Sequence, residues 1–324
     1  MADLLNISAS STSGQGLTGI APQQFDLKRY SSILLIPKDQ GFTAAERASI
    51  TAFLRALQTR TTVDDRTVRM FPIHGITGIA NSNTAPTEYT SGFGVKETIA
   101  DGSYFTTLTF RDGGLLRHAN LNEFNGEDYD IMLVDSYGKF LGRVDSAGLF
   151  CGLTGKFTVI PYDLPDDSNP SLYKATISFT DTKQLNQLSQ IGFMDCDNQF
   201  NFATSVPGIV GLVLDARAAT AAATINVGIK TVDGGVDMYD TYDDEFAYAT
   251  LFRVVKTSDW TTEVTINSVT KNAGKYWILA LAAYTGEVAV YLEGPTTLAG
   301  KNIGGAPAMS YEAVDPLIVT LPAP

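Results

Sequence analysis

Short runs of β-forming residues, separated by turn signals, recur along nearly the whole chain and restrict it to a fold made mainly of strands. The first clear run is Ile33–Ile36, an apolar stretch that ends at Pro37. Antiparallel strands with a helix laid against them predict an α+β domain over residues 25–205, built as a β-sandwich or barrel with a flanking helix.

One segment of this region has a convincing helical period. Thr43 and Glu46 are spaced as a capping box, in which each side chain bonds to the main-chain N–H of the other. The apolar residues that follow have the i, i+3, i+4, i+7 spacing of one helix face: Ile50, Phe53, Leu54 and Leu57. We therefore expect a helix over residues 44–58 that belongs to the core, with Arg47 and Arg55 facing away.

The other elements of residues 25–205 are predicted mostly as hairpins. Tyr89–Ile99 and Ser103–Phe110 are interpreted as two strands joined by a turn at Ala100–Gly102. A short helix is expected over Leu115–Phe124, because Asn125-Gly126 supplies a C-terminal cap. Further strands are predicted at Tyr129–Val134, Phe140–Val144, Phe157–Tyr162 and Leu172–Thr180.

The pattern changes near Val206-Pro207-Gly208, where we expect a domain boundary. Beyond it, in residues 206–324, about seven short strands in roughly 120 residues are typical of an immunoglobulin-like (Ig-like) β-sandwich. Trp277 suits a core position there, and Ala216–Ala223 is expected to be a surface turn that tolerates insertion. The predicted strands are Ile209–Asp215, Ala223–Lys230, Phe246–Val255, Thr262–Val269, Tyr276–Tyr284, Glu287–Leu292 and Leu317–Leu321.

The charge balance bears on possible partners. With a formal net charge of −12, the chain is a poor candidate for tight phosphate binding, because cationic side chains supply most of that affinity. An acidic wall would still let DNA slide past without sticking, although ordinary solubility also explains the charge. The two cysteines, Cys151 and Cys196, are too few for a disulfide framework and are expected to be small buried side chains in a reducing compartment.

The N-terminal segment, residues 1–24, is rich in Ser, Thr, Gly and Gln and is expected to be a flexible arm. It has neither the basic region nor the long apolar region of a signal peptide. No window approaches 18 uncharged apolar residues, so we expect no membrane insertion.

Candidate chemistry is sparse. The two histidines, His74 and His118, have no nucleophile or carboxylate placed nearby by sequence, and we expect structural or surface roles for both. Asp195–Gln199 only partly matches a calcium-binding loop. An acidic stretch from Asp233 to Glu245 is interpreted as a solvated turn, with calcium coordination in a sandwich loop as the alternative. We therefore predict no catalytic, cofactor-binding or metal-binding residues, no cofactor, and a protein that is not an enzyme.

Several short motifs resemble a family of virion proteins of tailed bacteriophages that infect Bacteroidetes. The resemblance covers roughly residues 25–185. It rests on Leu35-Ile36-Pro37-Lys38 and the capped helix, and on Arg69–Ile73, Thr107–Phe110, Asp112–His118, Phe124–Gly126, Tyr129–Asp135 and Gly138–Gly142.

Members of this family resemble tail-tube or tail-hub subunits, and the resemblance implies a virion structural protein that assembles into a ring or tube of the tail, around the genome-delivery channel. The implied partners are further copies in a homo-hexamer, neighbouring tail proteins, and genomic DNA that passes through the lumen without specific binding. The implied location is the virion, assembled in the host bacterial cytoplasm. The alternative is a capsid-decorating or host-surface-binding protein that contacts carbohydrate through its Ig-like domain, with Tyr239, Tyr242, Trp260 and Tyr284 as candidate stacking residues.

Overall fold

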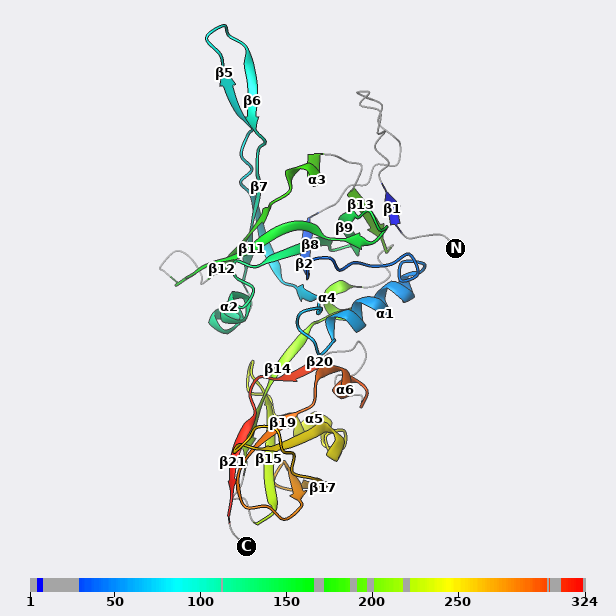
Figure 1. Cartoon of the computed structure of the whole chain (residues 1–324), viewed down its shortest axis with the longest axis vertical. Coiled ribbons are helices and arrows are strands. Elements are labelled where there is room, and N and C mark those ends of the chain that lie inside the picture. The colour runs from blue at the N-terminus through cyan, green and yellow to red at the C-terminus, as the bar shows by residue number, and fades with distance from the viewer. Residues whose placement is uncertain are drawn as a thin grey trace. The chain divides into compact units, whose positions relative to one another are not determined.

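The computed structural model describes residues 5–7, 29–111, 113–165, 172–186, 191–196, 201–217, 222–301, 303 and 310–322. It divides into two compact units, which are described separately. The N-terminal unit comprises Met1–Thr61 and Asp65–Pro207, and the C-terminal unit comprises Thr62–Asp64 and Gly208–Pro324. Both units are built mainly of strands in sandwich-like or barrel-like sheets, which confirms the predicted fold class (Figure 1).

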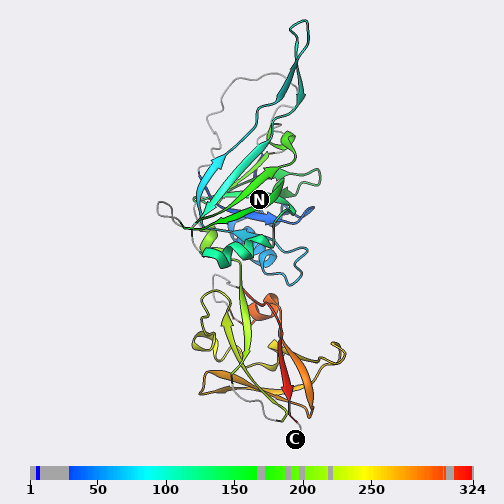
Figure 2. The same ribbon diagram turned by 90° about the vertical axis from the view of Figure 1, so that its left-hand side faces the viewer.

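The N-terminal unit contains an 11-stranded sheet that curls into a half-barrel (Figure 2). Its main path runs β1-β13-β9-β8-β11-β12-β7-β4, and β2, β3 and β10 pair off this path. These strands are β1 (Leu5–Ile7), β2 (Tyr30–Ile36), β3 (Phe71–Ile73), β4 (Ile76–Asn81), β7 (Tyr104–Phe110), β8 (Asp128–Asp135), β9 (Lys139–Val144), β10 (Phe150–Cys151), β11 (Leu153–Asp163), β12 (Leu172–Phe179) and β13 (Ile191–Asp195).

Strands β2 and β8 form the centre of this unit, and both are buried on their two faces. In β2, Leu34 and Ile36 belong to one hydrophobic cluster, whereas Ile33 and Leu35 belong to a second cluster on the opposite face. The residues of β8 alternate in the same way. Since neighbouring side chains of a strand point to opposite faces, burial on both sides requires a continuous apolar run, which is what the sequence of Ile33–Ile36 provides.

Helix α1 (Ile50–Thr61) covers the first of these clusters, and it begins later than predicted. Thr43 and Glu46 do form the reciprocal capping bonds, but they close a turn rather than the predicted helix over residues 44–58. Ser49 instead caps the helix, because its hydroxyl accepts from the N–H of Ala52 at 3.1 Å. Phe53 is fully buried on the core side, in keeping with the predicted stripe.

The prediction that Arg47 faces away from the core is wrong. Only 3% of this residue is exposed, and its guanidinium donates to the main-chain oxygens of Phe42, at 2.6 Å, and Gly148, at 3.0 Å. One acceptor lies in the loop before α1 and the other in the turn between β9 and β10, so the buried guanidinium has hydrogen-bond partners in place of water. Arg55 does face away, as predicted, and is exposed.

The described part of the N-terminal unit also contains the short helices α2 (Gly114–Asn122), α3 (Thr182–Asn186) and α4 (Phe202–Ser205). Helix α2 lies within the predicted segment Leu115–Phe124 apart from its first residue. Most of the predicted arm over residues 1–24 lies outside the described residues. Its described part, β1, pairs antiparallel with β13.

The C-terminal unit is a β-sandwich of two sheets. One sheet has the order β17-β18-β15-β14-β20 and the other the order β16-β19-β21. The strands are β14 (Ile209–Ala216), β15 (Thr224–Thr231), β16 (Phe252–Lys256), β17 (Ile266–Asn272), β18 (Tyr276–Leu281), β19 (Gly286–Leu292), β20 (Ser310–Ala313) and β21 (Leu317–Leu321). Strand β20 was not predicted, and it pairs in parallel with β14. The immunoglobulin assignment of this sandwich stays a prediction.

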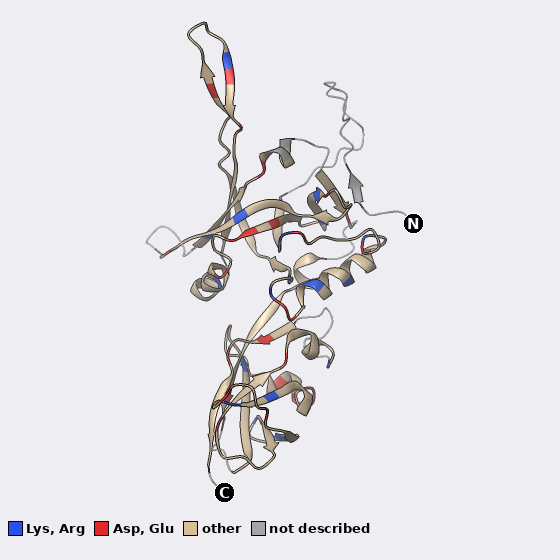
Figure 3. Ribbon diagram, viewed as in Figure 1, with Lys and Arg blue, Asp and Glu red and all other residues tan. Residues whose placement is uncertain are grey.

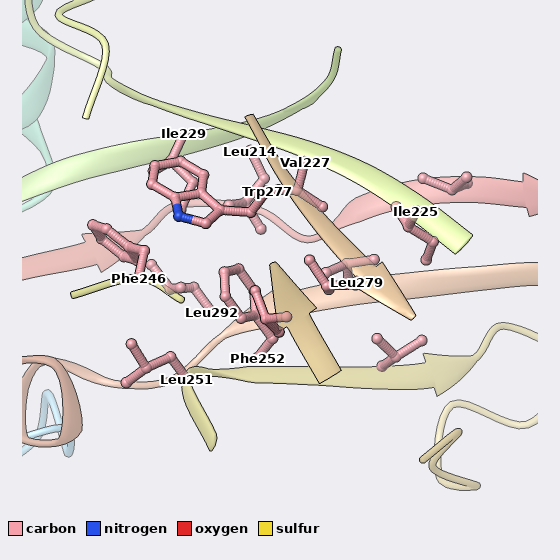
Figure 4. Close-up of a cluster of buried hydrophobic side chains, with 14 of the residues drawn as sticks. Leu214, Ile225, Val227, Ile229, Phe246, Leu251, Phe252, Trp277, Leu279 and Leu292 are labelled. Carbon is pink, nitrogen blue, oxygen red and sulfur yellow. The ribbon is translucent and has the colours of Figure 1, made fainter. Parts of the chain in front are cut away.

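Trp277 lies at the centre of the sandwich core, fully buried as predicted (Figure 4). Its indole N–H donates to the main-chain oxygen of Asp243 at 3.0 Å, so the one polar atom of the side chain is satisfied. The rings of Tyr239 and Phe246 pack against it at centroid distances of 5.0 and 5.3 Å.

The three residues Thr62–Asp64 belong to the C-terminal unit, although they follow α1 in the chain. The Asp64 carboxylate accepts from the N–H of Thr296 at 2.9 Å, in the first turn of α6 (Pro295–Ala299). A carboxylate at this position satisfies an N–H that has no partner inside the helix. The second break between the units falls between Pro207 and Gly208, within the predicted boundary segment.

Candidate assembly surface

A long two-stranded β-ribbon extends from the N-terminal unit over residues 76–110. At its base, β4 pairs with β7, and β7 is held in the sheet by β12. The pairing continues outward through main-chain bonds from Ser82 to Phe105 and from Thr84 to Ser103, both 2.9 Å. It then passes into the hairpin of β5 (Thr87–Thr90) and β6 (Lys96–Ala100), which projects from the sheet (Figure 1).

This arrangement corrects the predicted hairpin. Tyr89–Ile99 is not one strand, because the chain turns back within it, where the N–H of Ser91 donates to the oxygen of Val95 at 2.8 Å. Gly94 adopts a φ of 77°, a left-handed conformation that suits glycine in a turn. Ala100–Gly102 instead continues the ribbon between β6 and β7. The sequence signal that locates the turn is the pair of glycines in Ser91-Gly92-Phe93-Gly94.

The ribbon has one polar and one largely apolar face. Directly paired residues of two antiparallel strands share a face, and residues two apart along a strand do so as well. The pairs Glu88↔Thr98 and Thr90↔Lys96 form the polar face, on which Lys96 and Glu88 make an ion pair of 3.4 Å. Tyr89 pairs with Glu97, and Val95 and Ile99 share their face by alternation.

The apolar face has no cover among the described residues. Tyr89, Val95 and Ile99 are 56%, 55% and 67% exposed, and Phe93 at the turn is 97% exposed. Every residue of β5 and β6 is exposed. An isolated two-stranded ribbon is marginally stable in water, and clustered exposed apolar residues mark interaction surfaces. We therefore define the ribbon-tip surface as these four apolar side chains together with Glu97, which lies on the same face.

His74 lies between β3 and β4 and has a structural environment, as expected. Its Nδ1 lies 3.0 Å from the Ser32 hydroxyl and its Nε2 lies 2.8 Å from the oxygen of Val206. Burial is the main cause that lowers the pKa of this imidazole to about 4. His118, on α2, donates from Nε2 to the main-chain oxygen of Ile160 at 2.9 Å.

Both cysteines are buried, as expected, and they are not joined in a disulfide. Burial raises the pKa of the Cys151 thiol to about 11, so the reactive thiolate is disfavoured. Of the partial calcium-loop match, Asp197–Gln199 lies outside the described residues. Four residues of the predicted insertion-tolerant turn, 218–221, also lie outside them.

The acidic stretch near α5 (Tyr239–Tyr242) is occupied by ion pairs. Lys271 bonds to both Asp243 and Asp244, and Lys275 bonds to Asp240. These bonds raise the pKa of Lys271, and the hydrogen bond from Lys271 lowers the pKa of Asp243. Within the described residues, no group of three or more His, Cys, Asp or Glu side chains is arranged to hold a metal ion.

The four aromatic residues considered for carbohydrate stacking have different environments. Tyr239 packs against Trp277 in the core, and Tyr242 contacts Tyr311 at a centroid distance of 6.0 Å. The ring of Tyr284 lies under the Lys256 ammonium, 5.1 Å from its centroid. Trp260 is 55% exposed and has a φ of 57°, which is rare for a bulky residue. Only Trp260 combines wide exposure with a fixed loop position.

The loop that presents Trp260 is well ordered by hydrogen bonds. The Asp259 carboxylate accepts from the N–H groups of Thr261 and Thr262, at 3.0 and 2.9 Å, and from the Thr262 hydroxyl. These bonds lower the pKa of Asp259 to about 2. The N–H of Trp260 donates to the oxygen of Lys256 at 2.9 Å.

No helix among the described residues has the length and apolar character needed to cross a membrane. No protein-family model and no curated protein matches the chain. Among solved structures, a chain described as "Virion of native gene transfer agent (GTA) particle" is similar over 37% of this chain and 88% of its own length. The sequence identity is 15% and the TM-score is 0.22, and no conclusion about fold or function follows from so low a score.

Proposed function

We propose that this protein is a structural subunit of a tailed-bacteriophage virion that assembles with copies of itself through the β-ribbon of its N-terminal unit. The observation that carries the proposal is the uncovered ribbon-tip surface: a two-faced ribbon whose apolar face is covered by none of the residues that the structure describes. Leaving apolar area in water is unfavourable by roughly 25 cal/mol per Å², so a partner that covers it gains stability.

The sequence resemblance supplies the finer part of the proposal. Subunits of a phage tail tube or hub form rings, and we infer a ring or tube subunit of the tail, most simply a homo-hexamer. The net charge of −12 suits a channel wall that repels DNA and lets it pass. The buried histidine and thiol and the ion-paired acidic stretch also favour a structural over a catalytic role.

The proposal is tested by measuring the assembly state of the purified full-length chain. Light scattering over a range of concentrations, with electron microscopy of the same samples, is expected to show rings or tubes. The double variant Tyr89→Ser/Ile99→Ser is expected to assemble at least tenfold more weakly, with unchanged circular dichroism, because both side chains are exposed in the single chain.

The matched control is Glu88→Gln/Thr98→Ser, on the polar face of the same ribbon. This variant is expected to assemble as the wild type does. A wild-type chain that stays monomeric at every concentration, and is missing from virions, overturns the proposal. Equal weakening by the apolar-face and polar-face variants overturns the role of the ribbon-tip surface.

A second candidate function is favoured by Trp260. This residue holds an exposed indole on a loop braced by Asp259, and a braced aromatic ring of this kind is suited to stack on a sugar. The chain would then decorate the virion or bind the host surface through its C-terminal unit. A glycan-array signal that Trp260→Ala abolishes, with assembly intact, supports this function, and absence of any signal from the assembled protein counts against it.

A further inference from the structure

The exposed side of helix α1 carries a shallow hollow of about 590 Å³, lined by Ala45, Glu46, Ala52, Arg55, Ala56 and Arg60 among others. Its two cationic side chains, the exposed Arg55 and the partly buried Arg60, differ in their pairing. Arg60 binds Glu46 through two nitrogens, at 2.9–3.2 Å, and is neutralised. The guanidinium of Arg55 makes no hydrogen bond or ion pair with the described residues. In a chain of net charge −12, this helix is therefore a locally basic surface (Figure 3).

The ribbon-tip surface carries the opposite charge in a similar setting. Glu97 lies on the apolar face, paired with Tyr89 and next but one to both Val95 and Ile99. Its carboxylate makes no ion pair with the described residues, whereas Glu88 on the polar face is paired with Lys96. One surface is thus apolar around a free carboxylate, and the other is a hollow that contains a free guanidinium. Arginine and carboxylate groups pair well where water is partly excluded.

We propose that the ribbon-tip surface of one copy docks into the α1 hollow of the next copy, with Phe93 in the hollow and Glu97 paired with Arg55. The partner is a second copy because one chain cannot join its own two surfaces: within the N-terminal unit, the β5–β6 tip and α1 lie at opposite ends (Figures 1 and 2). A contact between two different surfaces of identical chains is head-to-tail. Such contacts close into rings or continue as tubes.

The inference rests on the proposed self-assembly and names the surface that receives the ribbon. Cysteine cross-linking tests it directly, and both native thiols are buried and do not compete. Phe93→Cys and Ala52→Cys chains are purified separately, and each is expected to give no cross-linked dimer. When they are mixed in equal amounts under oxidising conditions, a disulfide-linked dimer is expected. The control mixture uses Thr98→Cys, on the polar face, in place of Phe93→Cys and is expected to cross-link far less.

Charge exchange supplies a second readout. Glu97→Arg and Arg55→Glu are each expected to weaken assembly about tenfold, because each places like charges together. A mixture of the two variants, or the double variant, is expected to recover most of the loss. Both side chains are exposed, so folding is expected to be unchanged, and circular dichroism checks this.

The outcomes separate the two proposals. If the wild-type chain does not assemble, the proposed function fails and this inference fails with it. Two results overturn only the α1 docking site while the wild-type chain still assembles. In the first, Phe93→Cys cross-links to itself or fails to cross-link to Ala52→Cys. In the second, charge exchange gives no recovery of assembly. Cross-linking of Phe93→Cys to Ala52→Cys together with charge recovery supports the docking site.

Discussion

The imidazole of His74 donates from Nε2 to the main-chain oxygen of Val206, 2.8 Å away, at the last turn before the break between the two units. A carbonyl oxygen only accepts, so the proton is on Nε2 and Nδ1 accepts from the Ser32 hydroxyl at 3.0 Å. The ring of Phe202 packs against the imidazole at a centroid distance of 5.0 Å. His74 is therefore a neutral side chain that ties the end of the N-terminal unit to its sheet.

The burial of this neutral imidazole predicts an acid-sensitive fold, because desolvation is the main cause that lowers its pKa. The pKa of His74 is lowered from 6.5 to about 4 in the folded chain, so between these values the unfolded chain binds a proton that the folded chain does not. The contribution of neutral His74 to the free energy of unfolding is therefore complete above pH 6.5 and is lost as the pH falls toward 4. At 1.36 kcal/mol per pKa unit, the loss is about 3 kcal/mol. Urea unfolding of wild type and His74→Gln from pH 4 to 8 checks the effect.

The His74→Gln variant is expected to be less stable than wild type at pH 7 and to have a flatter dependence on pH below 6.5. The two curves are expected to run parallel from pH 7 to 8. Identical slopes between pH 4 and 6.5 would show that His74 does not cause the acid sensitivity.

A buried ion pair makes a second prediction. The Asp130 carboxylate, with 2% of its side chain exposed, accepts from Arg143 at 2.9 Å and from the Thr154 hydroxyl at 2.8 Å. Arg143→Met leaves this carboxylate buried without its counter-charge and is expected to cost about 3–5 kcal/mol of unfolding free energy. The double variant Arg143→Met/Asp130→Asn is expected to recover part of that loss.

The control for this pair is Lys38→Met. Lys38 and Asp128 form an ion pair of 3.1 Å whose side chains are about half exposed. Removing an exposed pair is expected to cost less than about 1 kcal/mol. Urea denaturation at pH 7 measures all these variants, and a similar cost for Arg143→Met and Lys38→Met would contradict the role given to burial.

A third prediction concerns Gly152, between β10 and β11. A Cβ at this position would lie 2.4 Å from main-chain atoms of Asp130 and Ile131, which cannot move without disturbing β8. Gly152→Ala is expected to destabilise the chain by about 3 kcal/mol, at the upper end of overpacking effects. Gly92→Ala is the control, because a Cβ there meets nothing within 4 Å. Thermal unfolding of the two variants should differ clearly; equal melting temperatures would refute the clash.

The fourth prediction concerns Trp260. Its left-handed conformation is unfavourable for any residue with a Cβ, by roughly 1–2 kcal/mol. Trp260→Gly is therefore expected to be more stable than Trp260→Ala by about 1 kcal/mol, measured by urea unfolding. If Trp260→Gly is also more stable than the wild type, the exposed indole does not contribute to folding stability, which favours a binding role. An alanine variant at least as stable as the glycine variant would contradict the strain.

Several elements of the fold follow from local sequence. Ile33–Ile36 is an uninterrupted apolar run because β2 is buried on both faces, and the strand predicted there is present. The stripe with Phe53 and Leu57 marks the buried side of α1 correctly. Trp277 was expected in the core and lies there. These features depend on period and residue type, which one strand or helix displays by itself.

The turn of the β-ribbon and the burial of Arg47 could be determined only from the tertiary structure. Both Ser91–Gly94 and Ala100–Gly102 carry turn signals, and the pairing of β7 with β4 and β12 decides that the chain reverses at the first. Arg47 follows a helical pattern that predicts an outward-facing side chain, yet it is buried. Its guanidinium bonds to the carbonyl groups of Phe42 and Gly148, and Gly148 lies 101 residues further along the chain. Local sequence determined which residues form strands and which helix face is apolar. Strand register, turn choice and buried polar contacts were decided only by tertiary structure, because they depend on partners distant in the chain.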